Sequence, residues 1–85
     1  MSEEELAQVL AVKRAHEKDL MQKPNVVGVG VGMRSRGGQF TGEPAIVVSV
    51  SRKVPRNHLA PQDVIPSELD GVPVDVQAIG FLRVL

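Results

Sequence analysis

The glycines between residues 28 and 32 have a spacing close to that of a phosphate-binding loop. A dinucleotide-binding loop has the pattern G-x-G-x-x-G after a strand and opens into a helix, whose N-terminus holds the pyrophosphate. Here Gly28, Gly30 and Gly32 give G-x-G-x-G, Met33 occupies the position of the last glycine, and a turn follows at 34–39. No Gly-Lys-Ser or Gly-Lys-Thr follows, as a P-loop requires. The stretch is therefore better interpreted as a structural strand than as a nucleotide site.

Histidine, serine and cysteine offer no recognisable catalytic or metal-binding arrangement. His16-Glu17 begins like the zinc motif H-E-x-x-H, but Leu20 stands where the second histidine belongs. Ser49 lies on a predicted strand, and no G-x-S-x-G sequence is present to expose a nucleophilic serine. The chain has no cysteine, which excludes a thiol nucleophile, a disulfide and a cysteine zinc site. We therefore predict no catalytic residue, no metal and no cofactor, and a protein that is not an enzyme.

Basic residues form two clusters in the sequence. Arg34 and Arg36 follow the glycine stretch, and Arg52, Lys53 and Arg56 follow the next apolar stretch. On a hairpin these clusters fall at opposite ends of the sheet, so we interpret them mainly as solvated surface. The alternative is that they contact an anionic ligand, because clustered cations attract anions.

The overall composition excludes several classes of partner. The chain has 85 residues with ten basic and ten acidic side chains, so it lacks the excess positive charge of a nucleic-acid binder. Two Phe with no Tyr or Trp also argue against a base-stacking platform. We expect no signal peptide, because the N-terminal residues lack a basic region and an apolar run, and no apolar stretch here is long enough to span a membrane. We expect one cytoplasmic domain over residues 1–85 that binds neither nucleic acid nor membrane.

The glycine stretch alternates between apolar and bare positions. Val27, Val29, Val31 and Met33 point to one face of the predicted strand, and the three glycines point to the other. A bare face lets another element approach the backbone closely, so we expect close packing on the glycine side. No charge interrupts the run, which favours a place in the middle of the sheet.

A helix is predicted over residues 3–21, before the glycine strand. Ser2 and Glu5 form an S-x-x-E capping box, and Pro24 ends the helical pattern. Lys13 and Glu17 interrupt its apolar stripe. Either this part of the helix overhangs the sheet in water, or the two charges pair with a neighbouring subunit.

Two further strands and a connection complete the predicted fold. Alternating apolar residues predict strands over 45–54 and 72–79, joined by a proline-containing crossover over 55–69 with an Asp70-Gly71 turn. The predicted class is α+β, with the N-terminal helix packed on a small, mainly antiparallel three-stranded sheet and an irregular crossover. The expected strand order is 2-1-3, with the glycine strand in the centre.

The C-terminal residues are too apolar for a solvated end. Phe81, Leu82, Val84 and Leu85 are the candidate interface residues of a homo-oligomer, most simply a dimer, since a small sheet leaves them uncovered. The alternative is a monomer in which this tail folds back on its own sheet.

Three segments carry a resemblance to a known group of proteins. They are NVVGVGVG at 25–32, PAIVVSVSRKVP at 44–55 and IPSELDGVPVDV at 65–76. In this order they resemble the segment that precedes the catalytic domain in bacterial trypsin-like serine peptidases, over residues 22–80. The catalytic triad of that family belongs to the later domain, so the resemblance implies an accessory module without catalytic residues, whose partner is a peptidase or another protein.

Two functions follow from these observations. The first is a non-catalytic interaction or assembly module. The alternative is a small-ligand or anion-binding domain that uses the glycine-rich strand and the nearby arginines.

Overall fold

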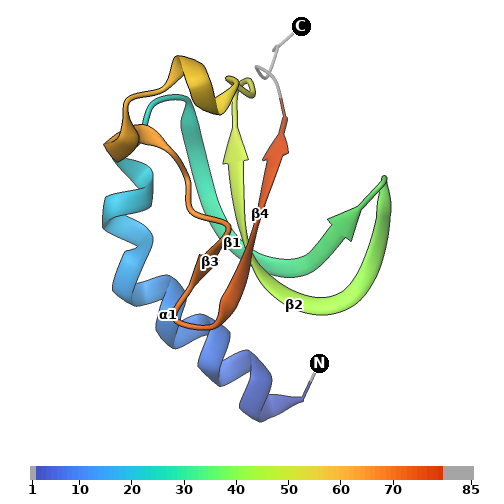
Figure 1. The fold of residues 1–85 in the computed structure, drawn as a ribbon. Helices are drawn as coiled ribbons and strands as arrows, with labels where there is room; N and C mark the ends of the chain where they lie inside the picture. The colour runs from blue at the N-terminus through green and yellow to red at the C-terminus, as the bar shows by residue number, and fades with distance from the viewer. Residues whose placement is uncertain (1, 80–85) are drawn as a thin grey trace, which may run out of the picture.

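One α-helix lies against one face of a four-stranded mixed sheet in the computed structural model, which describes residues 2–79 (Figure 1). This arrangement confirms the α+β class. The elements are α1 (Glu3–Met21), β1 (Val26–Arg36), β2 (Gln39–Val50), the short 3-10 turns η1 (Arg56–His58) and η2 (Pro61–Asp63), β3 (Glu68–Leu69) and β4 (Val72–Ala78).

The helix α1 has the bounds that the sequence predicts. The Ser2 Oγ accepts a hydrogen bond from the Glu5 N–H at 3.1 Å, which confirms Ser2 as the N-cap, and the Ser2 hydroxyl donates to the Glu5 carboxylate at 3.2 Å. Lys13 Nζ and Glu17 Oε1 lie 3.2 Å apart, one helical turn from each other. The charges that interrupt the apolar stripe therefore pair within the helix and need no neighbouring subunit.

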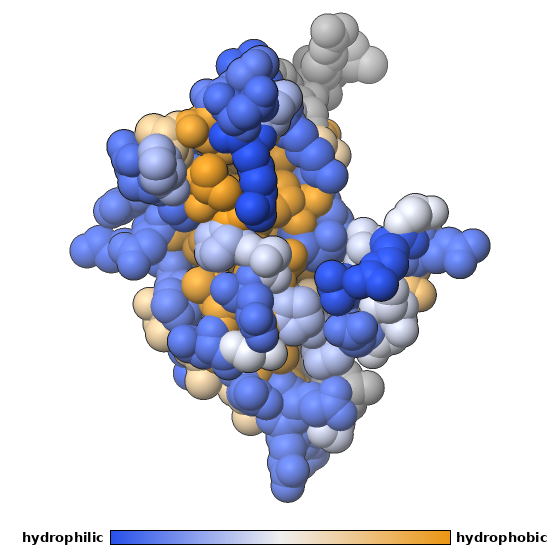
Figure 2. Space-filling view, viewed as in Figure 1, coloured by the Kyte–Doolittle hydropathy of each residue, from blue (hydrophilic) through white to orange (hydrophobic). Residues whose placement is uncertain are grey.

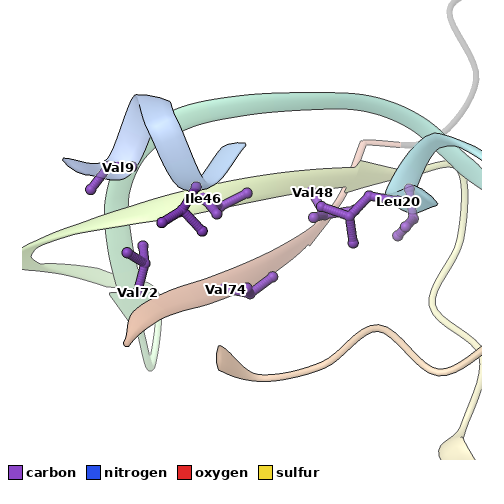
Figure 3. Close-up of a cluster of buried hydrophobic side chains, with 8 residues drawn as sticks. Val9, Leu20, Ile46, Val48, Val72 and Val74 are labelled. Carbon is purple, nitrogen blue, oxygen red and sulfur yellow. The ribbon is translucent and has the colours of Figure 1, made fainter. Parts of the chain in front are cut away.

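The core lies between α1 and the strands that face it (Figure 3). Leu20 from the helix and Ile46 and Val48 from β2 are its most deeply buried side chains. Burying a side chain of this size contributes about 1.5–3 kcal/mol to folding. The remaining buried members of the cluster are Val9, Val12, Val50, Val72 and Val74.

The strand order is β1-β2-β4-β3, so the predicted order 2-1-3 is wrong. β1 pairs with β2 antiparallel, and β4 pairs with the other edge of β2 in parallel, from Ile46 opposite Val74 to Val50 opposite Ala78. The inner strands are therefore β2 and β4, and the glycine strand β1 lies at an edge. The lack of charge over 26–33 comes from the apolar core face and the bare glycine face of this part of β1, and it does not indicate a neighbour on both sides. The charged residues of β1, Arg34 and Arg36, lie at its hairpin end.

The sheet has one strand more than predicted. The short β3 pairs antiparallel with the start of β4. The turn between them is the predicted Asp70-Gly71, with φ values of 49° and 83° at these residues. Positive φ at both central residues is typical of tight hairpin turns, in which Asp-Gly is a favoured pair.

A bulge at the start of β1 moves one valine out of the predicted face. Val26 lies opposite Val50 and Gly28 lies opposite Ser49, so Val27 is an extra residue without a partner. Val26, Val29 and Val31 pack against the core, whereas Val27 is 51% exposed. The prediction that Val29 and Val31 share a face is confirmed, and the prediction that Val27 shares it is wrong.

The β1–β2 hairpin bends away from α1 toward its turn, as Figure 1 shows. Gly37 and Gly38 form a tight turn with φ values of 59° and 82°, so the connection is shorter than the glycine-rich sequence suggests. A second register shift lies between Met33 and Ser35. Bulges bend the strand that contains them and increase its twist, which explains the curl of the hairpin at this point.

The glycine side of β1 is open, contrary to the prediction of close packing. A Cβ atom added at Gly30 would meet nothing within 4 Å, and one at Gly28 would make an ordinary contact of 3.8 Å with the Ser49 Cβ. At Gly32 the added Cβ would lie 3.1 Å from the Val47 Cγ2, which is a crowded contact. Among residues 2–79, no helix and no backbone atom lies within 4 Å of these added Cβ atoms.

Valine substitutions at two glycines test this description. We expect Gly30→Val to leave the free energy of unfolding unchanged or to raise it by up to about 1 kcal/mol, because the site is open and valine favours strands. Gly32→Val should lower it by about 1–3 kcal/mol, because the side chain of Val47 must move. Urea unfolding followed by circular dichroism at low protein concentration measures both values. A large loss of stability at Gly30 would contradict the open face.

Candidate functional site

A groove of about 640 Å³ lies on the face of the sheet opposite α1, inside the curl of the hairpin. We call it the glycine groove. Its floor is the backbone of β1, and none of its lining residues carries a charge. Open, largely apolar concavities are common binding sites. The lining consists of Gly28, Val29, Gly30, Val31, Gly32, Met33, Phe40, Val47, Ser49 and Gln77.

The free edge of β1 runs along this groove. β1 has a sheet neighbour on one side only, and Val26–Met33 contains neither a charge nor a proline. Charges and prolines are among the features by which edge strands avoid pairing with another chain, and the bulge at Val27 is a further such feature that this stretch does have. Phe40, on β2 beside the groove, is 73% exposed, the highest value among the large apolar side chains described. The groove and the edge therefore form one uncharged surface suited to backbone pairing and apolar contact.

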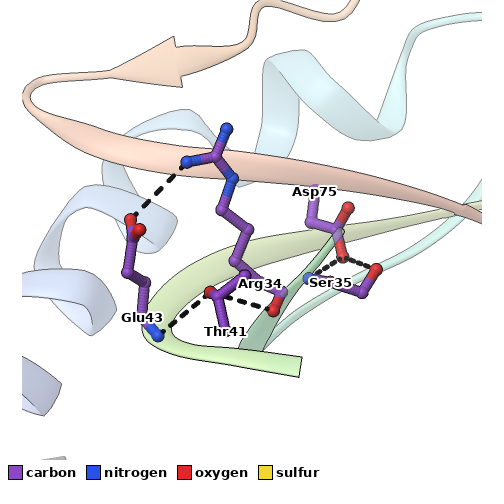
Figure 4. Close-up of polar contacts among 5 residues, drawn as sticks. All are labelled: Arg34, Ser35, Thr41, Glu43 and Asp75. Atoms are coloured by element: carbon purple, nitrogen blue, oxygen red, sulfur yellow. Dashed lines mark hydrogen bonds and ion pairs between the residues drawn. The ribbon is translucent and has the colours of Figure 1, made fainter. Parts of the chain in front are cut away.

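The curl that shapes the groove is held by Asp75 (Figure 4). Asp75 lies on β4, which is separated from β1 by β2, yet its Oδ2 accepts hydrogen bonds from the Ser35 N–H at 3.1 Å and from the Ser35 hydroxyl at 2.9 Å. The Gln77 amide donates a third, at 3.0 Å. The end of β1 is thereby tied across the concave face to β4.

The surroundings of Asp75 favour its charged form. Burial raises the pKa of Asp75, but the hydrogen bonds from Gln77 and Ser35 and the positive charge of Lys53 outweigh burial and lower the pKa below its ordinary value. The carboxylate is thus the ionised acceptor on which this crossing contact depends.

The first basic cluster lies at the hairpin, and neither of its arginines lines the glycine groove. Arg34 Nη1 lies 3.6 Å from Glu43 Oε2, and the Thr41 hydroxyl donates to the Arg34 carbonyl oxygen at 3.2 Å (Figure 4). Arg36 lies opposite Gln39, next to the turn. The charge of Arg34 is therefore partly balanced by its cross-strand neighbour.

The second basic cluster lines a different cavity. Arg52, Lys53 and Arg56 lie at a pocket of about 230 Å³ between the end of the sheet and the crossover. No arginine lines the glycine groove, so the structure does not bring the glycine strand and the two basic clusters into one site.

The histidines lie apart from both cavities. His16 Nε2 is 2.8 Å from Asp70 Oδ2, a contact that joins α1 to the turn between β3 and β4. His58 lies in η1. Within the part of the chain that the structure describes, no group of three or more His, Cys, Asp or Glu could hold a metal ion. No helix there is long and apolar enough to cross a membrane.

The predicted interface residues Phe81, Leu82, Val84 and Leu85 lie outside the described residues. Phe40 and the crossing contact from Asp75 to Ser35 were not predicted. The sequence gives only weak signals for them. Phe40 is one of two aromatic residues and lies in a polar turn region, and Asp75 is an outward-facing acid on a strand.

Removing the carboxylate of Asp75 tests the crossing contact. We expect Asp75→Asn to lower the free energy of unfolding at neutral pH by about 1 kcal/mol, the usual contribution of a hydrogen bond. Because the folded-state pKa is lowered, the stabilisation is present above the unfolded-state pKa and is lost as the pH falls through the folded-state value. In urea unfolding curves the difference between the two proteins should therefore stay constant from about pH 7 to about pH 5 and shrink as the pH falls below about 4.

Glu68→Gln is the control, since the Glu68 side chain is exposed and makes no hydrogen bond or ion pair among residues 2–79. It should leave the unfolding midpoint nearly unchanged at neutral pH. An Asp75→Asn protein as stable as the original would show that the contact does not hold the curl.

Comparison with known proteins identifies the family of the chain. Residues 2–80 match the model of the NARROW LEAF 1 N-terminal domain. The protein NARROW LEAF 1 of Oryza sativa subsp. japonica is 35% identical over 79 residues, which cover 89% of this chain and 13% of the rice protein. The chain thus corresponds to a small part of the length of that relative, and the matching family is described as an N-terminal domain.

This match corrects the resemblance to bacterial trypsin-like serine peptidases, which is wrong, and with it the view of the chain as a peptidase-associated module. The segments that carried the resemblance lie in β1, in β2 and in the β3–β4 hairpin with residues 65–67 before it. Among their glycines, Gly71 lies in a turn and those of the glycine stretch lie inside β1, so these residues report on how the sheet is built more than on descent. The chain belongs to the NARROW LEAF 1 N-terminal domain family.

Proposed function

We propose that this domain is a non-catalytic assembly module, which pairs with a second copy of itself through the edge of β1 and the glycine groove. The observation that carries the proposal is an eleven-residue edge strand with an uncharged stretch from Val26 to Met33 beside an open, uncharged groove. Such an edge is a template for another strand, because its outer N–H and C=O groups lack partners in the sheet.

A second copy is the partner that the charges favour. The chain has a formal net charge of zero, so two copies approach without net repulsion. Antiparallel pairing of two β1 strands about a two-fold axis places the same surface on both subunits, which is the commonest arrangement of homo-oligomers. The exposed Phe40 of each copy then lies next to apolar surface of the other.

The alternative of a small-ligand or anion site that uses the glycine strand together with the arginines has less support. The glycine groove has no charged lining residue, and the nearby Arg34 already lies beside Glu43. An anion in that groove would lose its hydration without gaining a cationic partner.

Gly30→Lys tests the docking surface separately from the fold. Because a Cβ at Gly30 meets nothing within 4 Å, the folded subunit can accommodate the lysine, whose charge then lies in the groove. We expect the unaltered chain to sediment as a dimer at micromolar concentrations and above, and Gly30→Lys to sediment as a monomer with an unchanged circular dichroism spectrum. Inward-pointing charges on edge strands oppose pairing in this way.

Leu6→Lys is the matched control. Leu6 is partly exposed on α1, which covers the other face of the sheet, so this substitution should leave the dimer intact. A chain that ends at residue 80 locates the interface further. If that chain is monomeric, the contact belongs to Phe81, Leu82, Val84 and Leu85 instead of β1. A monomeric unaltered chain would overturn the proposal.

A further inference from the structure

The pocket between the crossover and the end of the sheet is a second concavity, of a different chemical kind from the glycine groove. We call it the crossover pocket. It has a volume of about 230 Å³. Its lining comes from the end of the helix connection, from the ends of β2 and β4, and from the crossover: Pro24, Asn25, Val50, Arg52, Lys53, Val54, Arg56, Leu59, Asp63, Val64, Ile65 and Val76.

The floor of the crossover pocket is apolar. Val50 and Val76 contribute from the sheet, and Leu59, Val64 and Ile65 contribute from the crossover. The crossover members of this floor are only partly buried, so the crossover does not close over them. Figure 2 shows this apolar surface at the upper end of the molecule, crossed by hydrophilic side chains, where Figure 1 draws the crossover.

The rim of the crossover pocket is positively charged. Arg52, Lys53 and Arg56 face one acidic lining residue, Asp63. Among residues 2–79, none of the three cations lies within 4.0 Å of a carboxylate oxygen in an ion pair. Lys53 also contributes its charge to the surroundings of Asp75, so the two arginines are the cations most available to a ligand.

The walls of the crossover pocket are tied to the rest of the domain. Lys23 Nζ donates to the Gln62 carbonyl oxygen at 2.6 Å, which joins the end of α1 to η2. The Ser51 N–H donates to the Asn25 carbonyl oxygen at 2.8 Å. A pocket that is held in shape before binding loses less free energy in ordering its side chains and backbone.

We propose that the crossover pocket binds a small aliphatic carboxylic acid, with its apolar body on the valine and leucine floor and its carboxylate on Arg52 and Arg56. A planar guanidinium can hold a carboxylate through two parallel hydrogen bonds. Pockets for drug-sized ligands have volumes of about 300–1,000 Å³, so this smaller one suits a body of only a few carbons. The site does not depend on the pairing of β1, because the two surfaces share no lining residue.

Titration of the isotope-labelled chain with matched probes tests the proposal by NMR. Hexanoate is the probe, hexanamide has the same tail without the charge, and acetate has the charge without the tail. We expect saturable shifts at the amides of 52–56 and 64–65 with hexanoate, and affinities weaker by about tenfold or more for hexanamide and acetate. Arg52→Gln combined with Arg56→Gln should weaken hexanoate binding by a similar factor.

Arg34→Gln combined with Arg36→Gln is the control of equal charge change, and it should bind hexanoate as the unaltered chain does. Equal binding of hexanamide would show that no anion is recognised. Equal binding of acetate or of inorganic phosphate would show that the floor is not used. Each of these results would overturn the proposal. So would an equal loss of hexanoate affinity in the two double variants, or amide shifts spread over the whole surface.

Discussion

The apolar contact between α1 and β2 is the constraint on which the rest of the structure depends. Leu20 on the helix and Ile46 and Val48 on the strand have almost no exposed surface. Because β2 pairs with β1 on one edge and with β4 on the other, this contact fixes the whole sheet relative to the helix. A sheet covered by one helix keeps its second face uncovered unless another layer packs there. The glycine groove is a direct consequence of this two-layer construction.

The second face is organised by bare backbone and by curvature. Gly28 and Gly30 leave space above β1, while bulges bend the hairpin over that space. Asp75 then accepts hydrogen bonds from Ser35 across the concave side, and its ionised carboxylate is favoured there. The curl is therefore maintained by a polar contact between strands that are not sheet neighbours, in a region with few apolar contacts of its own.

Local features of the fold could be predicted from the sequence, and pairing between distant segments could not. The start of the helix follows from the contact between Ser2 and Glu5, its end follows from Pro24, and the Asp70-Gly71 turn follows from the backbone preferences of its residues. The predicted order of strands is wrong because β1, β2 and β4 all show period-two alternation, and this pattern does not specify which strand edges pair. The two-residue β3 has no periodicity to detect, and the bulge at Val27 depends on the register with β2.

In the candidate sites, too, the local residues could be recognised in the sequence, but the contacts between distant segments could not. The glycine stretch and the basic clusters stand out in the sequence, but the placement of the second cluster in a cavity apart from the glycine groove depends on the position of the crossover. Whether Arg34 is available to an anion could not be predicted from the residue type alone, because its neighbour Glu43 comes from the facing strand. The family match then replaces a resemblance that turn and strand residues had suggested, since similar sheets need similar glycines and prolines.

Parallel pairing between β2 and β4 also sets the order in which the chain can fold. The β1–β2 hairpin closes through a tight turn at Gly37-Gly38, whereas Val48 meets Val76 only after the intervening crossover has been brought back along the sheet. Closing a long loop costs entropy before its contacts form, so we expect hairpin and helix to assemble early and β4 to dock late. Until β4 docks, the edge of β2 is free as well as the edge of β1, and we expect both to be sites for premature association between nascent chains.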